Sequence, residues 1–105
     1  MTAHPRVSLA SIYTALRELI DPEVGINVID LGMIGNVTMA DDGGVIVAIM
    51  PTTPGCPMHD ALAAGTCQIV GALPGVAAVD VRFVHDPPWT PDRIAPEARA
   101  LLGIR

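Results

Sequence analysis

The apolar positions near the start of the chain recur three or four residues apart, which is the spacing of one face of a helix. These positions are Leu9, Ile12, Leu16, Leu19 and Ile20. Ser8 is a helix-capping residue type, and Asp21 precedes Pro22, which drives the residue before it out of helical conformation. We expect a helix over residues 9–20 and then an ordered loop over residues 21–32, with a brief strand at residues 28–29.

Two apolar stretches with strand-like alternation follow, at residues 33–40 and 45–50. The segment between them reads Asp41-Asp42-Gly43-Gly44, and its glycines supply the positive φ angles that a tight turn requires. Both faces of the second stretch are apolar, as in a strand that is covered on both sides. We therefore expect a β-hairpin whose second strand is central in its sheet.

A loop rich in proline and glycine, residues 51–57, leads into a second helix that we expect over residues 57–73. Proline is favoured at the first helical position, which Pro57 takes here, and Pro74-Gly75 ends the helix. One face of this helix carries Met58, Leu62, Ile69 and Leu73.

The last third of the chain alternates as a strand over residues 76–84 and continues as an extended loop over residues 85–91. A short helix over residues 96–102, closed by Gly103, completes the order. The sequence therefore predicts a two-layer α+β domain of the form helix–β-hairpin–helix–strand–helix, with the helices on one face of a small mixed sheet.

Length and charge narrow the class of protein. The chain has 105 residues, with six Arg, no Lys and eleven acidic residues, and its net charge is −5. We expect one domain, residues 1–105, in which residues 1–7 are a flexible arm. The acidic balance argues against binding to nucleic acid or to a membrane surface, and no apolar run approaches the roughly 20 residues of a membrane span. We expect a soluble, cytoplasmic protein without a signal segment.

The two cysteines, Cys56 and Cys67, are too few for a secreted disulfide scaffold, so we expect thiols. Cys56 lies at the predicted start of the second helix, where the helix dipole favours the thiolate that binds metal or attacks as a nucleophile. The alternative is a small apolar residue packed beneath the loop. Cys67 lies about 16 Å further along a continuous helix, beyond the roughly 7 Å that a disulfide allows between Cα atoms, and we interpret it as structural or incidental.

Four polar residues are candidates to shape a site around this cysteine. Pro22 gives the carboxylates of Asp21 and Glu23 a defined direction, although acids near turns often cap the local backbone instead. The hydroxyls of Thr52 and Thr53 could donate to an anion or a thiolate, or could belong to an ordinary strand end and turn.

His59 and Trp89 are the remaining candidates. His59 follows Cys56 by three residues and forms half of a zinc-type ligand pair, but no second pair exists, so structural zinc is not expected. A nucleophilic pair of Cys56 with His59 or His85 lacks a residue to orient the histidine. Trp89 lies in an open proline-rich loop, where it either covers an edge of the core or anchors a partner protein.

Five short motifs occur in order along the chain. They are Leu19-Ile20-Asp21-Pro22-Glu23, Asn27-Val28-Ile29-Asp30-Leu31-Gly32, Thr53-Pro54-Gly55-Cys56-Pro57, Leu73-Pro74-Gly75-Val76 and Pro87-Pro88-Trp89. Over residues 9–103 the chain thereby resembles the iron–sulfur cluster assembly family, the SufT-like and PaaD-like metal-sulfur cluster biosynthesis domain.

The resemblance implies an α+β fold of the same kind and a role in maturing iron–sulfur or related metal proteins. It implies that Cys56 is the reactive cysteine, with Asp21, Glu23, Thr52 and Thr53 around it where the first helix ends and the second begins. PaaD proteins carry a cysteine-rich C-terminal extension that does not follow Arg105, which favours the minimal form of the family. A helper role for one oxygenase remains open.

The leading hypothesis is an iron–sulfur cluster assembly, transfer or maturation factor in which Cys56 holds iron, a cluster or a persulfide sulfur. A cluster takes four ligands, mostly cysteines, and one monomer offers a single well-placed thiolate. We therefore expect a transient cluster or iron, none tightly bound by one monomer, and a homodimer, a client apoprotein or a cluster assembly protein as partner. The alternatives are a metal-free adaptor for a client apoprotein and, last, a small cysteine-dependent enzyme, and we expect no enzymatic activity.

Overall fold

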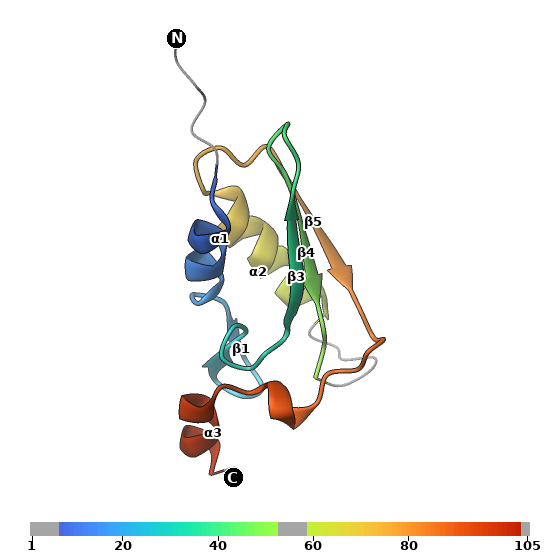
Figure 1. Cartoon of the computed structure of the whole chain (residues 1–105). Helices are drawn as coiled ribbons and strands as arrows, with labels where there is room; N and C mark the ends of the chain where they lie inside the picture. The colour runs from blue at the N-terminus through green and yellow to red at the C-terminus, as the bar shows by residue number, and fades with distance from the viewer. Residues whose placement is uncertain (1–6, 53–58, 104–105) are drawn as a thin grey trace.

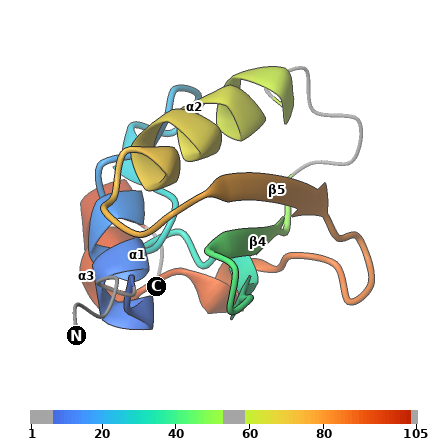
Figure 2. The same cartoon turned by 90° about the horizontal axis from the view of Figure 1, so that it is seen from above.

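In the computed structural model, which describes residues 7–52 and 59–103, two helices cover one face of a small mixed sheet, as predicted (Figure 1, Figure 2). The elements are α1 (Leu9–Leu16), β1 (Ile20–Asp21), β2 (Ile26–Asn27), β3 (Ile34–Met39), β4 (Gly44–Ile49), α2 (His59–Gly71), β5 (Ala78–Phe83), the 3-10 helix η1 (Pro91–Arg93) and α3 (Pro96–Leu102). Helices α1 and α2 form the covering layer, and α3 lies past the end of the sheet.

The three-stranded sheet has the order β3-β4-β5, so β4 is central, as its two apolar faces predict. β3 and β4 pair antiparallel as the predicted hairpin, and β5 pairs with β4 in parallel. In the turn, the Ala40 amide donates to the Gly44 carbonyl oxygen at 2.8 Å, and Gly43 has a φ of +90°. The predicted end of the last helix is also confirmed, because Gly103 closes α3 with a φ of +73°.

The hydrophobic core lies between this sheet and the helices. Its fully or nearly fully buried members include Ile12 and Leu16 of α1, Val37 of β3, Val45, Val47 and Ile49 of β4, and Leu62 and Val70 of α2. Burial of each such side chain stabilises the fold by roughly 1.5–3 kcal/mol. In β5, Val79, Val81 and Phe83 are half-buried while the residues between them are exposed, which confirms the predicted alternation.

The first helix is shorter than the apolar spacing predicts, and the expectation of a helix through residue 20 is wrong. α1 ends at Leu16, and the Leu19 amide donates to the Leu16 carbonyl oxygen at 3.0 Å in a tighter turn. The Leu19 side chain packs against Gly65 of α2, where an added Cβ would come within 2.6 Å of a Leu19 methyl carbon. Ile20 belongs to β1 and is 48% exposed. Leu19 and Ile20 continue the helical spacing in the sequence, but tertiary packing and strand pairing place them outside the helix.

The brief strand expected at residues 28–29 is also displaced. The strand is β2, which pairs antiparallel with β1 so that Ile20 lies opposite Asn27. Val28 is fully buried, and its amide donates to the Leu19 carbonyl oxygen at 2.9 Å. The short ladder ends where Val28 turns into the core.

Strand β4, helix α2 and strand β5 form a crossover unit with two parallel strands. The strands end side by side, because the Val84 amide donates to the Ile49 carbonyl oxygen at 2.8 Å. In open α/β sheets, ligands bind outside the carboxyl ends of parallel strands. We call this part of the molecule the carboxyl edge: the ends of β4 and β5 at Ile49 and Phe83, together with His59 at the described start of α2.

Candidate functional site

The expected cysteine site falls on residues 53–58, outside the described part of the chain, and this segment includes both Thr53 and Cys56. The helix start predicted at residue 57 lies outside it as well. The flanking residues are described: Thr52 is half-buried in a bend after β4, and His59 is the first described residue of α2. The segment that carries Cys56 therefore connects β4 to α2 and is tied to the carboxyl edge at both ends.

His59 lies on the carboxyl edge with its ring stacked on Phe83, the last residue of β5. The two ring centres are 4.3 Å apart and the ring planes differ by 12°. His85 lies two residues beyond β5, with its ring centre 6.0 Å from that of His59 and the planes tilted by 39°. The crossover thus brings together two histidines and a phenylalanine from segments that are distant in the sequence.

One nitrogen of this cluster has no hydrogen-bond partner. The Nε2 atom of His59 is buried, and no residue in the described ranges bonds to it. A buried polar atom without a partner costs roughly 1–3 kcal/mol of stability, and proteins normally satisfy such atoms with protein groups, water or ions. His59 therefore has unused capacity to bind a ligand.

Asp21 is the last residue of β1, directly before the turn that leads to β2. It is 3% exposed, and its carboxylate accepts a hydrogen bond from the Glu23 amide at 2.8 Å. Its main-chain carbonyl oxygen accepts from the amides of Val24 at 3.2 Å and Gly25 at 2.7 Å. Asp21 thus makes the local backbone contact that the sequence offered as the alternative to a site role.

The polar contacts described join Asp21 to its neighbour Glu23 but not to the candidate residues near Cys56. Over residues 7–52 and 59–103, no hydrogen bond or ion pair links Asp21 to Thr52 or His59. Glu23 is exposed in the turn that follows Asp21. The grouping of these residues around Cys56 stays a prediction.

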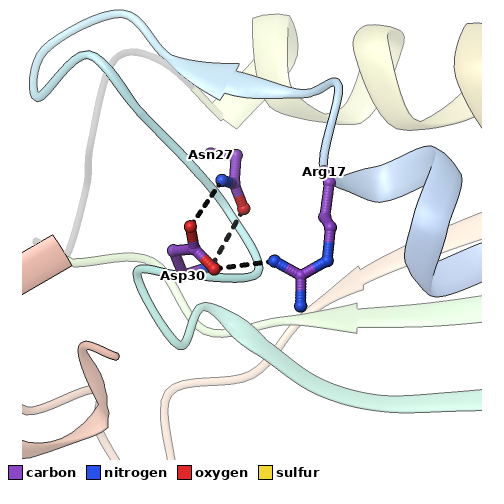
Figure 3. A network of polar contacts seen from close by, with 3 residues as sticks. All are labelled: Arg17, Asn27 and Asp30. Atoms are coloured by element: carbon purple, nitrogen blue, oxygen red, sulfur yellow. Dashed lines mark hydrogen bonds and ion pairs between the residues drawn. The ribbon is translucent and has the colours of Figure 1, made fainter. Parts of the chain in front are cut away.

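A polar network that the sequence did not predict holds the loop after β2 (Figure 3). Asp30 accepts from Arg17 Nη1 at 2.8 Å through Oδ1 and from Asn27 Nδ2 at 2.9 Å through Oδ2. The Asp30 amide donates back to Asn27 Oδ1 at 2.9 Å. The spacing of Asn27 and Asp30 is a local signal for such a turn, but Arg17 joins from the end of α1 and no sequence pattern marks it.

The C-terminal segment is fastened to the next stretch of this loop by a set of contacts that we call the clasp. Trp89 Nε1 donates to the Leu31 carbonyl oxygen at 2.7 Å. Arg93 donates through Nε to the Gly32 carbonyl oxygen at 2.7 Å and through Nη2 to that of Ile34 at 3.3 Å. Trp89 packs half-buried on the core, as expected of a residue that covers a core edge, and its role as a partner anchor stays a prediction.

Gly32 is required by the clasp. Its φ is +70°, which disfavours any side chain, and an added Cβ would overlap the main-chain oxygen of Arg93. Arg93 was not among the predicted site residues, because its partners lie about sixty positions earlier in the chain.

The interpretation of the second cysteine as structural or incidental stays a prediction. Cys67 is a free, exposed thiol on α2, and its Sγ lies 3.9 Å from the Val79 carbonyl oxygen. Among the described residues, no cluster of three or more His, Cys, Asp or Glu side chains could hold a metal ion. Nor does any helix in the described ranges have the length and apolar character to cross a membrane.

Comparison with known proteins identifies relatives of this chain along most of its length. A family model described as iron-sulfur cluster assembly protein matches residues 9–81, from α1 into β5. The chain is 33% identical over 95 residues to the Fe-S protein maturation auxiliary factor YitW of Bacillus subtilis, and the match covers 90% of this chain and 93% of that protein.

A longer relative contains a similar region. The chain is 38% identical over 72 residues to an iron-sulfur cluster carrier protein of Mycobacterium tuberculosis, covering 69% of this chain and 19% of the carrier. The fold is also that of a solved structure, a domain of unknown function from Bacillus anthracis, with a TM-score of 0.85 and 30% sequence identity. That superposition covers 91% of this chain and 92% of the other.

Proposed function

Because the chain belongs to the iron–sulfur cluster assembly protein family, we propose that it assembles or transfers iron–sulfur clusters, or matures the metalloproteins that need them. The match over residues 9–81 carries this proposal, since it includes β4, α2, the first part of β5 and the segment with Cys56. The similarity to a maturation auxiliary factor over 90% of the chain supports it.

In this proposal, Cys56 is the ligand for iron, for a cluster or for a persulfide sulfur. Its motif, Thr-Pro-Gly-Cys-Pro, belongs to the connection between β4 and α2, and such connections carry the ligand-binding groups of many α/β proteins. A thiolate is the form of cysteine that binds iron. Asp21, Glu23, Thr52, Thr53 and His59 shape the surroundings of the thiolate.

The chain has too few cysteine ligands to hold an iron–sulfur cluster permanently. A cluster is held by four ligands, mostly cysteine thiolates, whereas this chain contains two cysteines and Cys67 stands free on α2. The remaining ligands must therefore come from a second copy of the chain, from a partner protein or from small thiols. Such shared ligation suits a cluster that is passed on rather than kept.

The partners in this proposal are client apoproteins and cluster-carrying proteins. In the Mycobacterium tuberculosis carrier, the similar region is 19% of a longer chain, so a unit of this kind works there as part of a cluster carrier. We expect this chain to contact such proteins, with Trp89 as one anchor, and to act in the cytoplasm without catalytic turnover.

Anaerobic reconstitution with ferrous iron and sulfide tests the proposal. The measurements are iron and sulfide per chain and visible absorption, for the wild type, Cys56→Ala and the matched control Cys67→Ala. Wild type and Cys67→Ala should acquire a coloured, labile cluster, and Cys56→Ala should show less than a tenth of the wild-type sulfide content and visible absorption. Equal loading of Cys56→Ala and wild type would rule out Cys56 as the ligand.

A pull-down with a client apoprotein separates the proposal from the adaptor alternative. A metal-free adaptor binds its client equally well after Cys56 is alkylated in the Cys67→Ala chain. A factor that holds its cargo at Cys56 transfers no cluster to the client after the same treatment. Undiminished transfer from the alkylated chain would contradict the proposal.

A further inference from the structure

We propose that His59 and His85 together bind a divalent transition-metal ion at the carboxyl edge, through their imidazole nitrogens and without a cysteine ligand. This inference goes beyond the proposed function, because it needs no cysteine and no cluster. It rests on three observations of the described residues: the separation of the two rings, the fixed position of one of them, and the unpartnered nitrogen of His59.

The separation of the rings is close to that of two ligands on one ion. With metal–nitrogen distances of about 2.1 Å, two imidazoles on one tetrahedral ion have ring centres roughly 5.3 Å apart. The centres of His59 and His85 are 6.0 Å apart, so a small shift of the exposed His85 ring would bring both onto one ion, and their planes are tilted by 39° rather than stacked. Stacked rings bury each other's faces, whereas tilted rings can direct nitrogens toward a common point.

The position of His59 is set before any ion arrives. Its ring lies 4.3 Å from Phe83 and almost parallel to it, at the described start of α2. His85 follows Val84, whose amide is bonded to Ile49 at 2.8 Å, so the backbone leading to the second ring is held as well. Prior positioning of ligands lowers the entropy that is lost on binding.

The chemistry of the two groups selects the ion. Neutral imidazole suits iron, nickel, copper and zinc, and it is a poor ligand for calcium and magnesium. The buried Nε2 of His59 has no partner in the described ranges, so coordination would satisfy it without breaking an existing hydrogen bond. His85 is exposed, so an ion can approach the pair of rings from the side of His85.

A site with only two imidazole ligands binds a metal ion weakly. Among the described residues no third His, Cys, Asp or Glu side chain completes a cluster, so water or a partner's ligand fills the other positions of the ion. An ion held this way exchanges readily. The site therefore suits a metal ion on its way through the protein rather than a permanent structural metal.

Cobalt(II) titration of the whole chain in the Cys56→Ala background tests the site without interference from the thiolate. His59→Phe keeps an aromatic ring on Phe83 and removes both nitrogens, and His85→Gln removes the second ligand. His4→Gln is the matched control, since it removes the third histidine of the sequence. Calorimetry gives the affinity, and paramagnetic broadening of the imidazole signals by NMR identifies the ligands.

The expected result is one cobalt ion per chain, with His59 and His85 signals broadened first. His59→Phe and His85→Gln should each weaken binding at least tenfold, and His4→Gln should leave it unchanged. The inference is overturned if His59→Phe or His85→Gln binds cobalt like its parent, if His4→Gln weakens binding equally, or if the Cys56→Ala chain binds none. The failure of cluster reconstitution is a separate result, because that assay depends on Cys56 and this one does not.

Discussion

In the clasp, the side-chain donors of Trp89 and Arg93 meet the carbonyl oxygens of Leu31, Gly32 and Ile34. At the carboxyl edge, by contrast, the buried Nε2 of His59 meets no partner within the described residues. The two regions lie in the same small fold but differ in what their polar groups do. In the clasp, the polar side chains form hydrogen bonds that hold the chain together. At the carboxyl edge, the Nε2 atom of His59 remains available to a ligand.

The comparison indicates that the clasp contributes to stability, whereas the carboxyl edge provides an atom that can bind a ligand. Polar groups that are fully paired contribute to folding, whereas an unpaired buried nitrogen lowers stability unless a ligand arrives. Substitutions in the clasp should therefore reduce stability, and a substitution that removes the His59 nitrogens should not. Four variants test this division.

Gly32→Ala should have the largest effect. The new methyl group would overlap the main-chain oxygen of Arg93, and the residue would also have to keep a φ of +70°. We expect a loss of about 3 kcal/mol or more in the free energy of unfolding, measured by urea denaturation.

Gly25→Ala is the control for Gly32→Ala. Gly25 has a φ of +79°, but its added Cβ would meet nothing within 4 Å. It should lose only about 1 kcal/mol, from backbone strain alone. Equal losses in the two variants would show that the clasp contact at Arg93 does not constrain Gly32.

Trp89→Phe should have the next largest effect. It removes the indole donor and leaves the carbonyl oxygen of Leu31, a residue that is 1% exposed, without that 2.7 Å bond. The expected loss is roughly 1–2 kcal/mol in urea denaturation, with cobalt binding at the carboxyl edge unchanged. A variant as stable as the wild type would contradict the structural importance of this bond.

His59→Phe should have an effect of opposite sign. It keeps the stack on Phe83 and removes the nitrogen that lacks a partner in the described part of the chain, so stability should rise by up to about 1 kcal/mol in metal-free buffer. His59→Ala is the control, and it should lose about 1 kcal/mol because the stack is lost. A clear loss of stability in His59→Phe would mean that the nitrogens already contribute to folding.

Arg17→Ala should have the smallest effect. The side chains of Arg17 and Asp30 are 56% and 32% exposed, so water screens their 2.8 Å ion pair. We expect a loss of about 0.5 kcal/mol or less, and a smaller one in high salt. Arg82→Ala provides the comparison, because its pair with Asp80 is more exposed still, at 64% and 57%. A loss above 1 kcal/mol in Arg17→Ala would show that the network of Figure 3 acts as a unit.

Much of the fold follows from local chemistry that the sequence displays. The hairpin is set by Asp-Gly-Gly between two alternating stretches, and the end of the last helix is set by Gly103 with its positive φ. The sequence does not show the end of α1, because Leu19 and Ile20 continue a helical spacing. Their positions are decided by Gly65 of α2 and by the pairing with β2, and neither is adjacent in the chain.

The candidate site was less predictable for the same reason. His59 was singled out by its proximity to Cys56 in the sequence, but its contacts with Phe83 and His85 depend on the register of β5. The sequence around Asp21 is compatible both with a site role and with a backbone cap. The folded structure shows the cap, a 2.8 Å hydrogen bond from the Glu23 amide to the Asp21 carboxylate. Residue type and spacing suggested candidates, and long-range pairing determined their neighbours.

The parallel pairing of β4 with β5 also affects the order in which the parts of the sheet fold. The hairpin of β3 and β4 closes through a short turn, whereas β5 reaches β4 only after α2 has been traversed. Contacts between distant segments form later than local ones, because more chain entropy is lost in closing the larger loop. On a ribosome, the hairpin can therefore form while β5 is still being synthesised. The carboxyl edge, which needs both strand ends, is completed among the last parts of the nascent protein.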